Sequence, residues 1–345
     1  MRKQRIFYSE ATNGGGLRKM ETEILLRKAR IKDTTGGQDQ KRDVTLTGIT
    51  IPESISGIFL DEIAQQSKLL PFVHLVRFKG RAREIVGCSI NDAAWTEACD
   101  EAGEIVLDLR EIILDAFKVC GYFAICDTVR DGADPELFNE LVSSVGGAIA
   151  RAIDKAILFG TGAKMPVGIC TRLTQTQEPT GWKGTAPAWE DLHSTHVITL
   201  DVDDETGAAF FTPISDALAV AEPVLSDDGL FWAMNRKTHR HLLAKAGAYG
   251  FSEAAPVMPI IGGKIVDMDS GLIPDNQIIG GYGANYILGE RTEMALLQSQ
   301  HYYFLQDQTV YKAVGHYDGQ PAAARSFVVL RYDGTAPTTS ASFTE

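Results

Sequence analysis

The sequence predicts an α+β fold, and three observations lead to this prediction. A long amphipathic helix is expected over residues 134–159. Residues 73–106 have the pattern of an extended two-stranded excursion, with a basic first limb and an acidic second limb. After residue 257, short apolar runs separated by glycine or aspartate are typical of antiparallel sheet. With 345 residues, 44% of them hydrophobic, the chain is long enough for two or three domains and a sizeable core.

The charge of the chain limits the partners that it can bind. The formal net charge is −12, which argues against tight binding to nucleic acid phosphates. An acidic wall is nevertheless suited to enclosing DNA, because repulsion keeps packed nucleic acid from sticking to it. The alternative is that the acidity only confers solubility. The sequence has neither an apolar run long enough for a membrane span nor an apolar signal-peptide core, so we expect no membrane partner and no secretion.

The cysteines predict reduced, mostly structural thiols. Their number, five, is odd, and no two of them have C-x-x-C spacing. The alternative is a staple between Cys88 and Cys99, either within a hairpin or between neighbouring subunits.

The first 43 residues differ in charge from the rest of the chain. They contain eleven lysines or arginines and six aspartates or glutamates. Residues 17–31 are predicted to form a charged helix after the glycine-rich residues 13–16. We expect a terminal arm here, either mobile or crossing onto a neighbouring subunit. Residues 44–51 then predict a strand, and residues 58–70 an apolar helix that begins near Ser56.

The two limbs of the excursion carry opposite charges. Basic residues alternate along the first limb: Arg77, Lys79, Arg81 and Arg83. In one extended strand all four would lie on the same face and repel one another unless acidic groups lie opposite. The second limb carries the acidic residues Glu97, Asp100, Glu101 and Glu104. Two interpretations stay open: these charges pair within the hairpin, or they pair with an adjacent subunit.

The long helix has clear start signals. Asp134 is expected to accept hydrogen bonds from the first turn, and Pro135 has a preset φ at a position that needs no donor. A helix of this extent is roughly 39 Å long, so we expect it to act as a beam. Gly146 and Gly147 lower its helix propensity by about 2 kcal/mol. Another element is therefore expected to pack closely against the backbone there, or to bend it.

Glycine and proline also mark the end of this helix. Gly160 and Gly162 are expected to adopt the left-handed conformation of a helix terminus, and Pro166 is expected to stop a restart. Residues 171–187 have the composition of a connecting loop.

The later part of the chain alternates predicted helices and strands. Residues 210–225 predict a helix and residues 229–235 a buried strand. The next helix is expected to begin at His239, with Thr238 as its cap. Further strands are predicted over residues 264–268, 277–280, 285–288, 295–298, 310–317 and 327–331. Residues 336–345, rich in Thr and Ser, are expected to form a loose tail.

No constellation of catalytic, cofactor-binding or metal-binding residues is predicted. The pairs His193/His196 and His239/His241 have spacings compatible with two metal ligands, but no carboxylate or cysteine completes a zinc pattern. The run from Gly160 to Gly162 lacks the GK[ST] ending of a phosphate loop and is better explained as a helix cap. A soluble two-domain metal-dependent enzyme that uses a histidine pair is kept as an alternative of a different class.

Three of these features carry a family resemblance. The long helix closes in LFGTGAKMPVGI, a later strand reads FWAMNRKTHRHL, and a glycine-rich all-β segment follows. In this order they resemble the major capsid protein of tailed bacteriophages, with the Hong Kong ninety-seven type capsid fold. The resemblance covers residues 60–332 and implies a structural protein, not an enzyme, that builds icosahedral shells. A related alternative is an encapsulin-like bacterial nanocompartment shell.

The resemblance implies a division of the chain. It consists of an N-terminal arm or assembly segment (1–43), the start of the peripheral domain (44–76), an extended β-hairpin loop (77–107), the peripheral domain with its long spine helix (108–170), a connecting loop (171–199), an axial domain with a central sheet (200–306), C-terminal strands of the peripheral domain (307–333) and a flexible tail (334–345). The first segment is then either an arm or a remnant of assembly scaffolding.

The resemblance also implies roles for single residues. Trp95 and Glu97 are similar to an aromatic-x-glutamate pattern in the loop that overlaps the next subunit. The stretch from Asn235 to Thr238 resembles the strand-to-helix turn of the family. Some members join a lysine of this loop to an asparagine of a neighbour, and Lys79 lies where that lysine would be. Since Tyr317-Asp318-Gly319-Gln320 stands where an asparagine motif would be needed, we expect Lys79 to make an ionic contact instead.

The implied partners are copies of the chain itself, in homo-hexamers and homo-pentamers. A portal, a scaffold or a maturation protease would assist assembly in the host cytoplasm. The finished virion capsid would enclose double-stranded DNA without sequence-specific binding, and no cofactor is implied.

Overall fold

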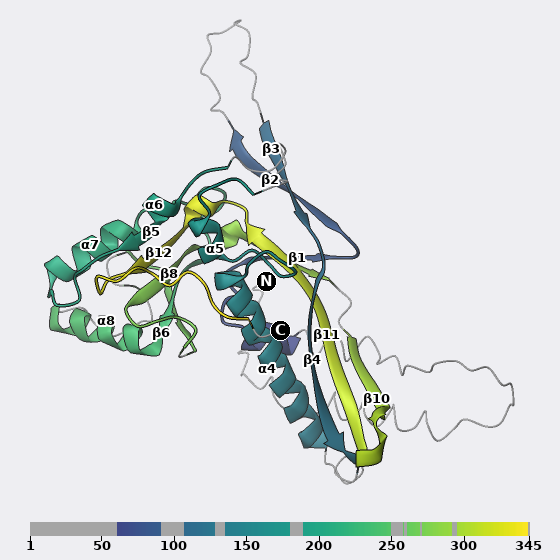
Figure 1. The fold of residues 1–345 in the computed structure, drawn as a ribbon. Coiled ribbons are helices and arrows are strands. Elements are labelled where there is room, and N and C mark those ends of the chain that lie inside the picture. Colours follow the sequence, from purple (N-terminus) through teal and green to yellow (C-terminus); the bar gives the residue numbers. More distant parts are fainter. Residues whose placement is uncertain are drawn as a thin grey trace, which may run out of the picture.

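The structure is a computed structural model, and it describes residues 61–90, 107–127, 135–179, 189–249, 258, 261–269, 271–291 and 295–343. Figure 1 shows an elongated molecule in which a two-stranded hairpin projects at one end and a long helix runs beside long strands toward the other. A second sheet with its own helices forms a lateral lobe (Figure 1). The described residues therefore form an extended body with one projecting hairpin.

The elements follow in chain order. The strands are β1 (His74–Phe78), β2 (Ala82–Ile90), β3 (Leu107–Leu114), β4 (Phe117–Cys126), β5 (Val197–Thr199), β6 (Leu230–Asn235), β7 (Lys264–Met268), β8 (Gln277–Tyr282), β9 (Tyr286–Arg291), β10 (Ala295–Tyr303), β11 (Gln308–Pro321) and β12 (Phe327–Arg331). The helices are α4 (Pro135–Phe159), α5 (Ile169–Thr174), α6 (His193–His196), α7 (Ala208–Leu218) and α8 (Arg236–Tyr249), with 3-10 turns η1 (Gly283–Asn285), η2 (Phe304–Gln306) and η3 (Ala324–Ser326).

The first sheet has the strand order β1-β9-β11-β10, with β4 also paired to β11. Over its 14 residues β11 pairs antiparallel with β4 and β10 in its first part and with β9 in its last part. Val119, Phe123 and Ile125, which alternate along β4, pack against the main core cluster that also contains the buried side of α4. One face of this sheet therefore supports the long helix.

The second sheet has the order β5-β12-β8-β6-β7 and is buried on both faces. Along β6, Phe231 and Ala233 join the core cluster of α4 and α5, whereas Trp232 and Met234 join the cluster beneath α7 and α8. Strands buried on two sides have continuous apolar sequences, which explains the uninterrupted run FVVL in β12.

The prediction of antiparallel sheet after residue 257 is confirmed for the described strand pairs within that segment, because β8 pairs antiparallel with β12, and β11 pairs antiparallel with β9 and β10. Three strands of the segment also pair in parallel with strands from earlier in the chain. β6 pairs parallel with β7, β5 with β12, and β1 with β9. The helix α8 lies between β6 and β7 in the sequence, and a helical crossover is the connection that parallel neighbours require. β1 and β5 pair with strands that are distant in sequence, which a local pattern does not reveal.

The sheets also differ from the predicted allocation of strands to domains. β9 and β10, expected in the axial domain, pair with β11 in the first sheet. β12, expected beside the long helix, pairs with β8 and β5 in the second sheet. The reason is that β12 is apolar on both faces and needs a position between two covering layers.

The beam helix is confirmed as α4, with a close neighbour at its two glycines. The helical segment at residues 61–66 crosses α4 there, and Gln66 Nε2 donates to the Ser143 carbonyl at 2.8 Å. A Cβ on Gly147 would lie 2.1 Å from Gln66 Oε1, and one on Gly146 would lie 3.2 Å from Glu62 Cγ. The prediction of close packing is correct, whereas Asp134 lies outside the described residues.

Several predicted boundaries change. The first helix has ended by residue 67, α7 ends at Leu218, and α5 occupies residues predicted as loop. Asp154 ends the first of these helices, because its carboxylate accepts hydrogen bonds from Ser67 Oγ at 2.5 Å and from the Lys68 and Leu69 amides at 2.9 and 3.2 Å. These donors turn the chain toward α4.

The C-terminal residues up to 343 are bound along the body, in contrast to the loose tail that was predicted. Gln277 forms two hydrogen bonds with the backbone of Thr338, at 2.7 and 2.8 Å. Lys155 donates to the Ser342 carbonyl at 2.5 Å, and its ammonium lies 4.6 Å from the centre of the Phe343 ring. This segment therefore connects the second sheet to α4.

Candidate functional site

Four of the predicted contact residues, Arg77, Lys79, Arg81 and Arg83, lie at or near the base of the projecting hairpin. β2 and β3 pair antiparallel from Ala82↔Leu114 to Ile90↔Leu107. The hairpin base, defined here as Arg77, Arg81, Asp115, Glu290 and Asp318, joins this hairpin to the first sheet. The other predicted contacts, Trp95, Glu97, Asp100 and Glu101, lie outside the described residues.

The prediction that four basic residues share one face of one strand is wrong. Gly80 has φ +88°, and the chain turns there between β1 and β2. β1 belongs to the first sheet and β2 to the hairpin, so Arg77 is separated from Arg81 and Arg83. Lys79 is exposed within the turn. Gly80 marks the end of the strand in the sequence, because glycine readily adopts this left-handed conformation.

The arginines have acidic partners within the chain. Arg81 Nε lies 2.9 Å from Asp115 Oδ1, and Arg83 forms an ion pair with Glu111 on the opposite strand. Both arginine side chains are largely exposed, so each pair contributes at most about 1 kcal/mol to stability. These carboxylates do not belong to the predicted acidic limb: Glu111 lies within β3 and Asp115 directly follows it.

Arg77 has a buried partner that sequence reasoning missed. Its Nε lies 3.0 Å from Glu290 Oε2, and Tyr317 Oη donates to Glu290 Oε1 at 2.9 Å. Glu290 is 4% exposed. Burial raises the pKa of Tyr317, with a further contribution from Glu290. The three residues come from β1, β9 and β11, whose pairing the sequence did not predict.

Asp318 links the first sheet to the start of β4. Its carboxylate accepts hydrogen bonds from the Asp115 amide at 2.6 Å and from the Gly319 amide at 2.7 Å. Burial raises the pKa of Asp318 to about 6, although these two hydrogen bonds oppose the shift. The carboxyl therefore titrates near neutral pH at the point from which the hairpin projects.

We expect Asp318→Asn to flatten the pH dependence of stability between about pH 4 and about pH 7. The pKa of Asp318 is higher in the folded chain than its ordinary value of 3.8. Its contribution to stability is therefore fully present below the ordinary pKa and is lost as the pH rises through about 6. Unfolding midpoints of both proteins across this range measure the effect. Equal pH slopes for wild type and variant would contradict it, and Asp216→Asn, on the exposed side of α7, is the control.

A tight loop joins the end of α4 to α5. The Gly160 amide donates to Ala156 O, and the Gly168 amide donates back to Gly160 O, each at 2.8 Å. Gly162 has the expected left-handed conformation, with φ +77°. Gly160 does not, and it is needed instead because a Cβ there would lie 2.2 Å from the buried carbonyl of Pro166.

This loop is anchored to the first sheet. The Val167 amide donates to Gly319 O at 2.7 Å, and Tyr286 Oη donates to Val167 O at 2.9 Å. Tyr286 is fully buried, and burial raises its pKa. The end of the beam is thus tied to β9 and β11.

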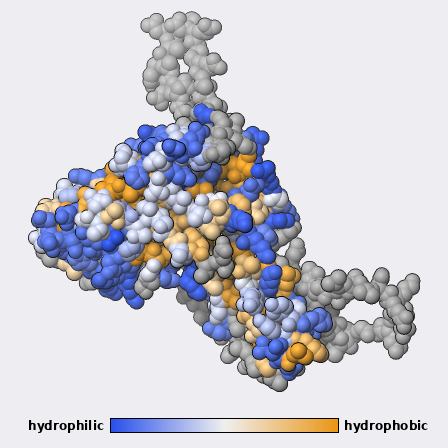
Figure 2. Space-filling model, viewed as in Figure 1, coloured by the Kyte–Doolittle hydropathy of each residue, from blue (hydrophilic) through white to orange (hydrophobic). Residues whose placement is uncertain are grey.

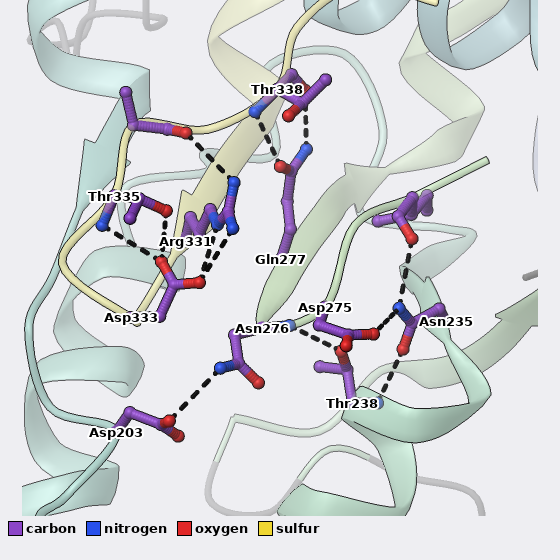
Figure 3. A network of polar contacts seen from close by, with 12 residues as sticks. Asp203, Asn235, Thr238, Asp275, Asn276, Gln277, Arg331, Asp333, Thr335 and Thr338 are labelled. Carbon is purple, nitrogen blue, oxygen red and sulfur yellow. Dashed lines mark hydrogen bonds and ion pairs between the residues drawn. The ribbon is translucent and has the colours of Figure 1, made fainter. Parts of the chain in front are cut away.

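The strand-to-helix turn from Asn235 to Thr238 has a different cap from the one predicted. Figure 3 shows the Thr238 amide donating to Asn235 Oδ1, at 2.7 Å, so Asn235 caps α8, which begins at Arg236. The Thr238 hydroxyl accepts from the Asn276 amide at 2.8 Å. Asn235 also donates to Asp275 at 2.7 Å and to the Ile273 carbonyl at 3.1 Å. The motif is therefore a structural joint between α8 and the second sheet.

The histidine pairs do not form a metal centre. His239 contacts Asp267 at 2.6 Å, His241 lies 3.3 Å from Tyr332 Oη, and His196 is buried beside Thr195. Within the described ranges, no three His, Cys, Asp or Glu side chains converge to hold an ion. None of the helices described there is long and apolar enough to cross a membrane.

The comparisons with known proteins agree with this architecture. The model of the phage capsid family matches residues 47–332. The capsid of an empty GTA particle has a TM-score of 0.55 and 15% identity, covering 90% of this chain and 98% of its own. A structure from Mycobacterium phage Bobi aligns with a TM-score of 0.51 and 15% sequence identity, and the alignment covers 89% of this chain and 99% of the phage chain. A chain from the procapsid of satellite phage P4, a structure that includes the size determination protein, aligns with a TM-score of 0.50 and 11% sequence identity. The alignment covers 91% of this chain and 97% of the phage P4 chain.

No curated protein sequence matches the chain significantly. The fold is that of the capsid proteins of tailed phages. The chain belongs to the phage capsid family, because the family model covers most of its length. It is therefore a structural shell protein of the virion, and the alternative of a metal-dependent enzyme is wrong.

Proposed function

We propose that this chain assembles through hexamers and pentamers into a closed icosahedral shell around double-stranded DNA. The observation that carries the proposal is the match of the phage capsid family over residues 47–332. The elongated shape supports it, because a long body with a projecting hairpin can contact several neighbouring subunits (Figure 1). Many modest contacts then sum to a stable container when the symmetry closes.

The projecting hairpin is proposed to overlap the next subunit. Arg81 and Arg83 already have partners at its base, so the contacts with a neighbour fall to other residues. Exposed Lys79, and beyond the described strands Trp95, Glu97, Asp100 and Glu101, are the proposed inter-subunit contacts. The exposed Ile85, on β2, adds apolar surface to the same arm.

The two sheets suggest a revised division into domains. We assign α4 and the first sheet to the peripheral domain, and the second sheet with α7 and α8 to the axial domain. The C-terminal segment up to residue 343 bridges them. Residues 1–43 are an arm or an assembly segment.

The charge of the chain supports a container role. With a net charge of −12, the shell would repel packed DNA, so enclosure needs no sequence-specific contact. The procapsid of satellite phage P4 contains a size determination protein, and a scaffold, a portal or a maturation protease is proposed as a partner here as well. Assembly is placed in the host cytoplasm.

Electron microscopy of the purified full-length chain tests this function. Closed shells or hexameric and pentameric rings are expected, and particles purified from infected cells should contain DNA and a portal. A small monodisperse species at all concentrations would contradict the proposal. Shells that hold a cargo protein and lack DNA and a portal would indicate a nanocompartment instead.

A further inference from the structure

The far end of the first sheet exposes an unusual set of large apolar side chains. Tyr302, near the end of β10, is 71% exposed, and Phe304 and Leu305, in the turn η2 that connects β10 to β11, are 75% and 92% exposed. Tyr122, exposed on β4, lies beside the same connection, because Tyr122 and Tyr303 interact. We name Tyr122, Tyr302, Phe304 and Leu305 the apolar tip. Figure 2 shows a small hydrophobic patch at this end of the molecule, bordered by hydrophilic residues.

The tip is held in place by local hydrogen bonds. The turn η2 closes at Asp307, which has φ +51° and whose amide donates to Phe304 O at 3.3 Å. The Asp127 amide donates to Asp307 O at 2.9 Å, so the ends of β4 and β11 are tied together. The Tyr302 and Tyr303 rings meet edge to face at 4.8 Å. Because the turn is already ordered, these side chains lose little conformational entropy when they bind another surface.

We propose that the apolar tip is a contact with a second copy of this chain, driven by burial of hydrophobic surface rather than by ion pairs. The proposal rests on the proposed shell function and names one of its contacts. Residues 302–306 form five consecutive uncharged positions in a chain with a net charge of −12. Two acidic copies repel one another, so this run of uncharged side chains, which ends at the exposed Asp307, is a place where they can approach closely.

The size of the tip favours a shell contact over a free dimer. Its three aromatic rings and one leucine offer on the order of 600 Å² of exposed surface. A stable pair of proteins buries about 800 Å² on each partner. The tip alone is therefore too small to hold two subunits together in dilute solution. It contributes when other contacts, such as those of the hairpin, hold the subunits in a lattice.

A contact driven by burial of apolar surface predicts how shell assembly responds to temperature and to salt. Hydrophobic association weakens on cooling, so shells should form less readily in the cold. Salt screens the repulsion between acidic subunits and does not weaken apolar contacts, so added salt should favour assembly. An ionic contact would show the opposite response to salt.

The variant Leu305→Ser tests the contact in the full-length chain. We expect it to raise the protein concentration needed for assembly about tenfold, because one fully buried leucine is lost from each contact. It should also reduce the sensitivity to cold. The control is Val224→Ser, which removes an apolar side chain that is 41% exposed far from the tip and should leave assembly unchanged. Circular dichroism and unfolding midpoints check that both variants fold.

A second readout identifies the partner. A photoreactive benzophenone amino acid in place of Phe304 should give covalent oligomers of this chain in assembled particles. Cross-links only to DNA, or none, would overturn the proposal. If the wild type forms no shells, the proposed function fails. If wild type and Leu305→Ser form shells at the same concentration, only the tip contact is wrong.

Discussion

Replacing Gly160 with alanine is expected to lower the free energy of unfolding by about 3 kcal/mol. The new Cβ would lie 2.2 Å from Pro166 O and 2.5 Å from Ala156 O, and both are backbone atoms within a closed loop. The loop cannot widen without breaking the hydrogen bond from Gly168 to Gly160 at 2.8 Å. Denaturant unfolding of the unassembled chain measures the change.

Gly121→Ala is the matched control for this substitution. Gly121 lies in β4, and a Cβ there would meet no atom within 4 Å. We expect its stability to be unchanged or slightly raised, because alanine loses less backbone entropy on folding than glycine. Equal stability of the Gly160 variant and the control would show that the loop is not tightly closed.

Asp154→Ala is expected to destabilise the fold by a similar amount, about 3 kcal/mol. The substitution removes the acceptor for the Ser67 hydroxyl and for the amides of Lys68 and Leu69. These donors join residues 61–70 to α4, and Ser67 and Leu69 are buried. Buried hydrogen-bond donors that lose their acceptor lower the stability of the fold by their full desolvation cost.

Hydrogen exchange locates this effect. In Asp154→Ala, the amides of Lys68 and Leu69 should exchange faster, while those of β6 and β8 keep their protection. The control Asp216→Ala removes an exposed carboxylate from α7 and should be close to neutral. Unchanged protection at residues 67–70 would contradict the role of Asp154 as the anchor of this turn.

Elements with strong local signals were predictable from the sequence. The helix α4 has a proline at its start and glycines at its end, and it agrees with the predicted range except for its first residue. The close approach at Gly146 and Gly147 followed from their low helix propensity. Strands such as β6 and β7 were found because each is a short apolar run between turn residues.

Features that depend on distant pairing were not predictable. Arg77 was assigned to the hairpin because it alternates with later basic residues, yet β1 pairs with β9, more than two hundred positions along the chain. The buried Glu290 depends on that pairing and was missed. Asn235 was passed over as the cap because Thr238 is also a good capping residue, and only the geometry separates them.

The C-terminal segment shows a different limit. Composition rich in Thr and Ser suggested a loose tail, but backbone groups form its main contacts. Thr338 binds through its amide and carbonyl to Gln277, and Ser342 binds through its carbonyl to Lys155. Side-chain composition does not report such contacts. The apolar tip was also not predicted, because residues 302–306 lie between the predicted strands at 295–298 and 310–317, and an apolar sequence does not by itself indicate exposure.

A three-dimensional reconstruction of assembled particles by cryo-electron microscopy tests most directly whether this chain works by tiling with copies of itself. We predict a closed icosahedral shell in which the hairpin of β2 and β3 lies against an adjacent copy. A chain that stays monomeric or forms only a small closed oligomer, with this hairpin in contact with no other subunit, would contradict that prediction.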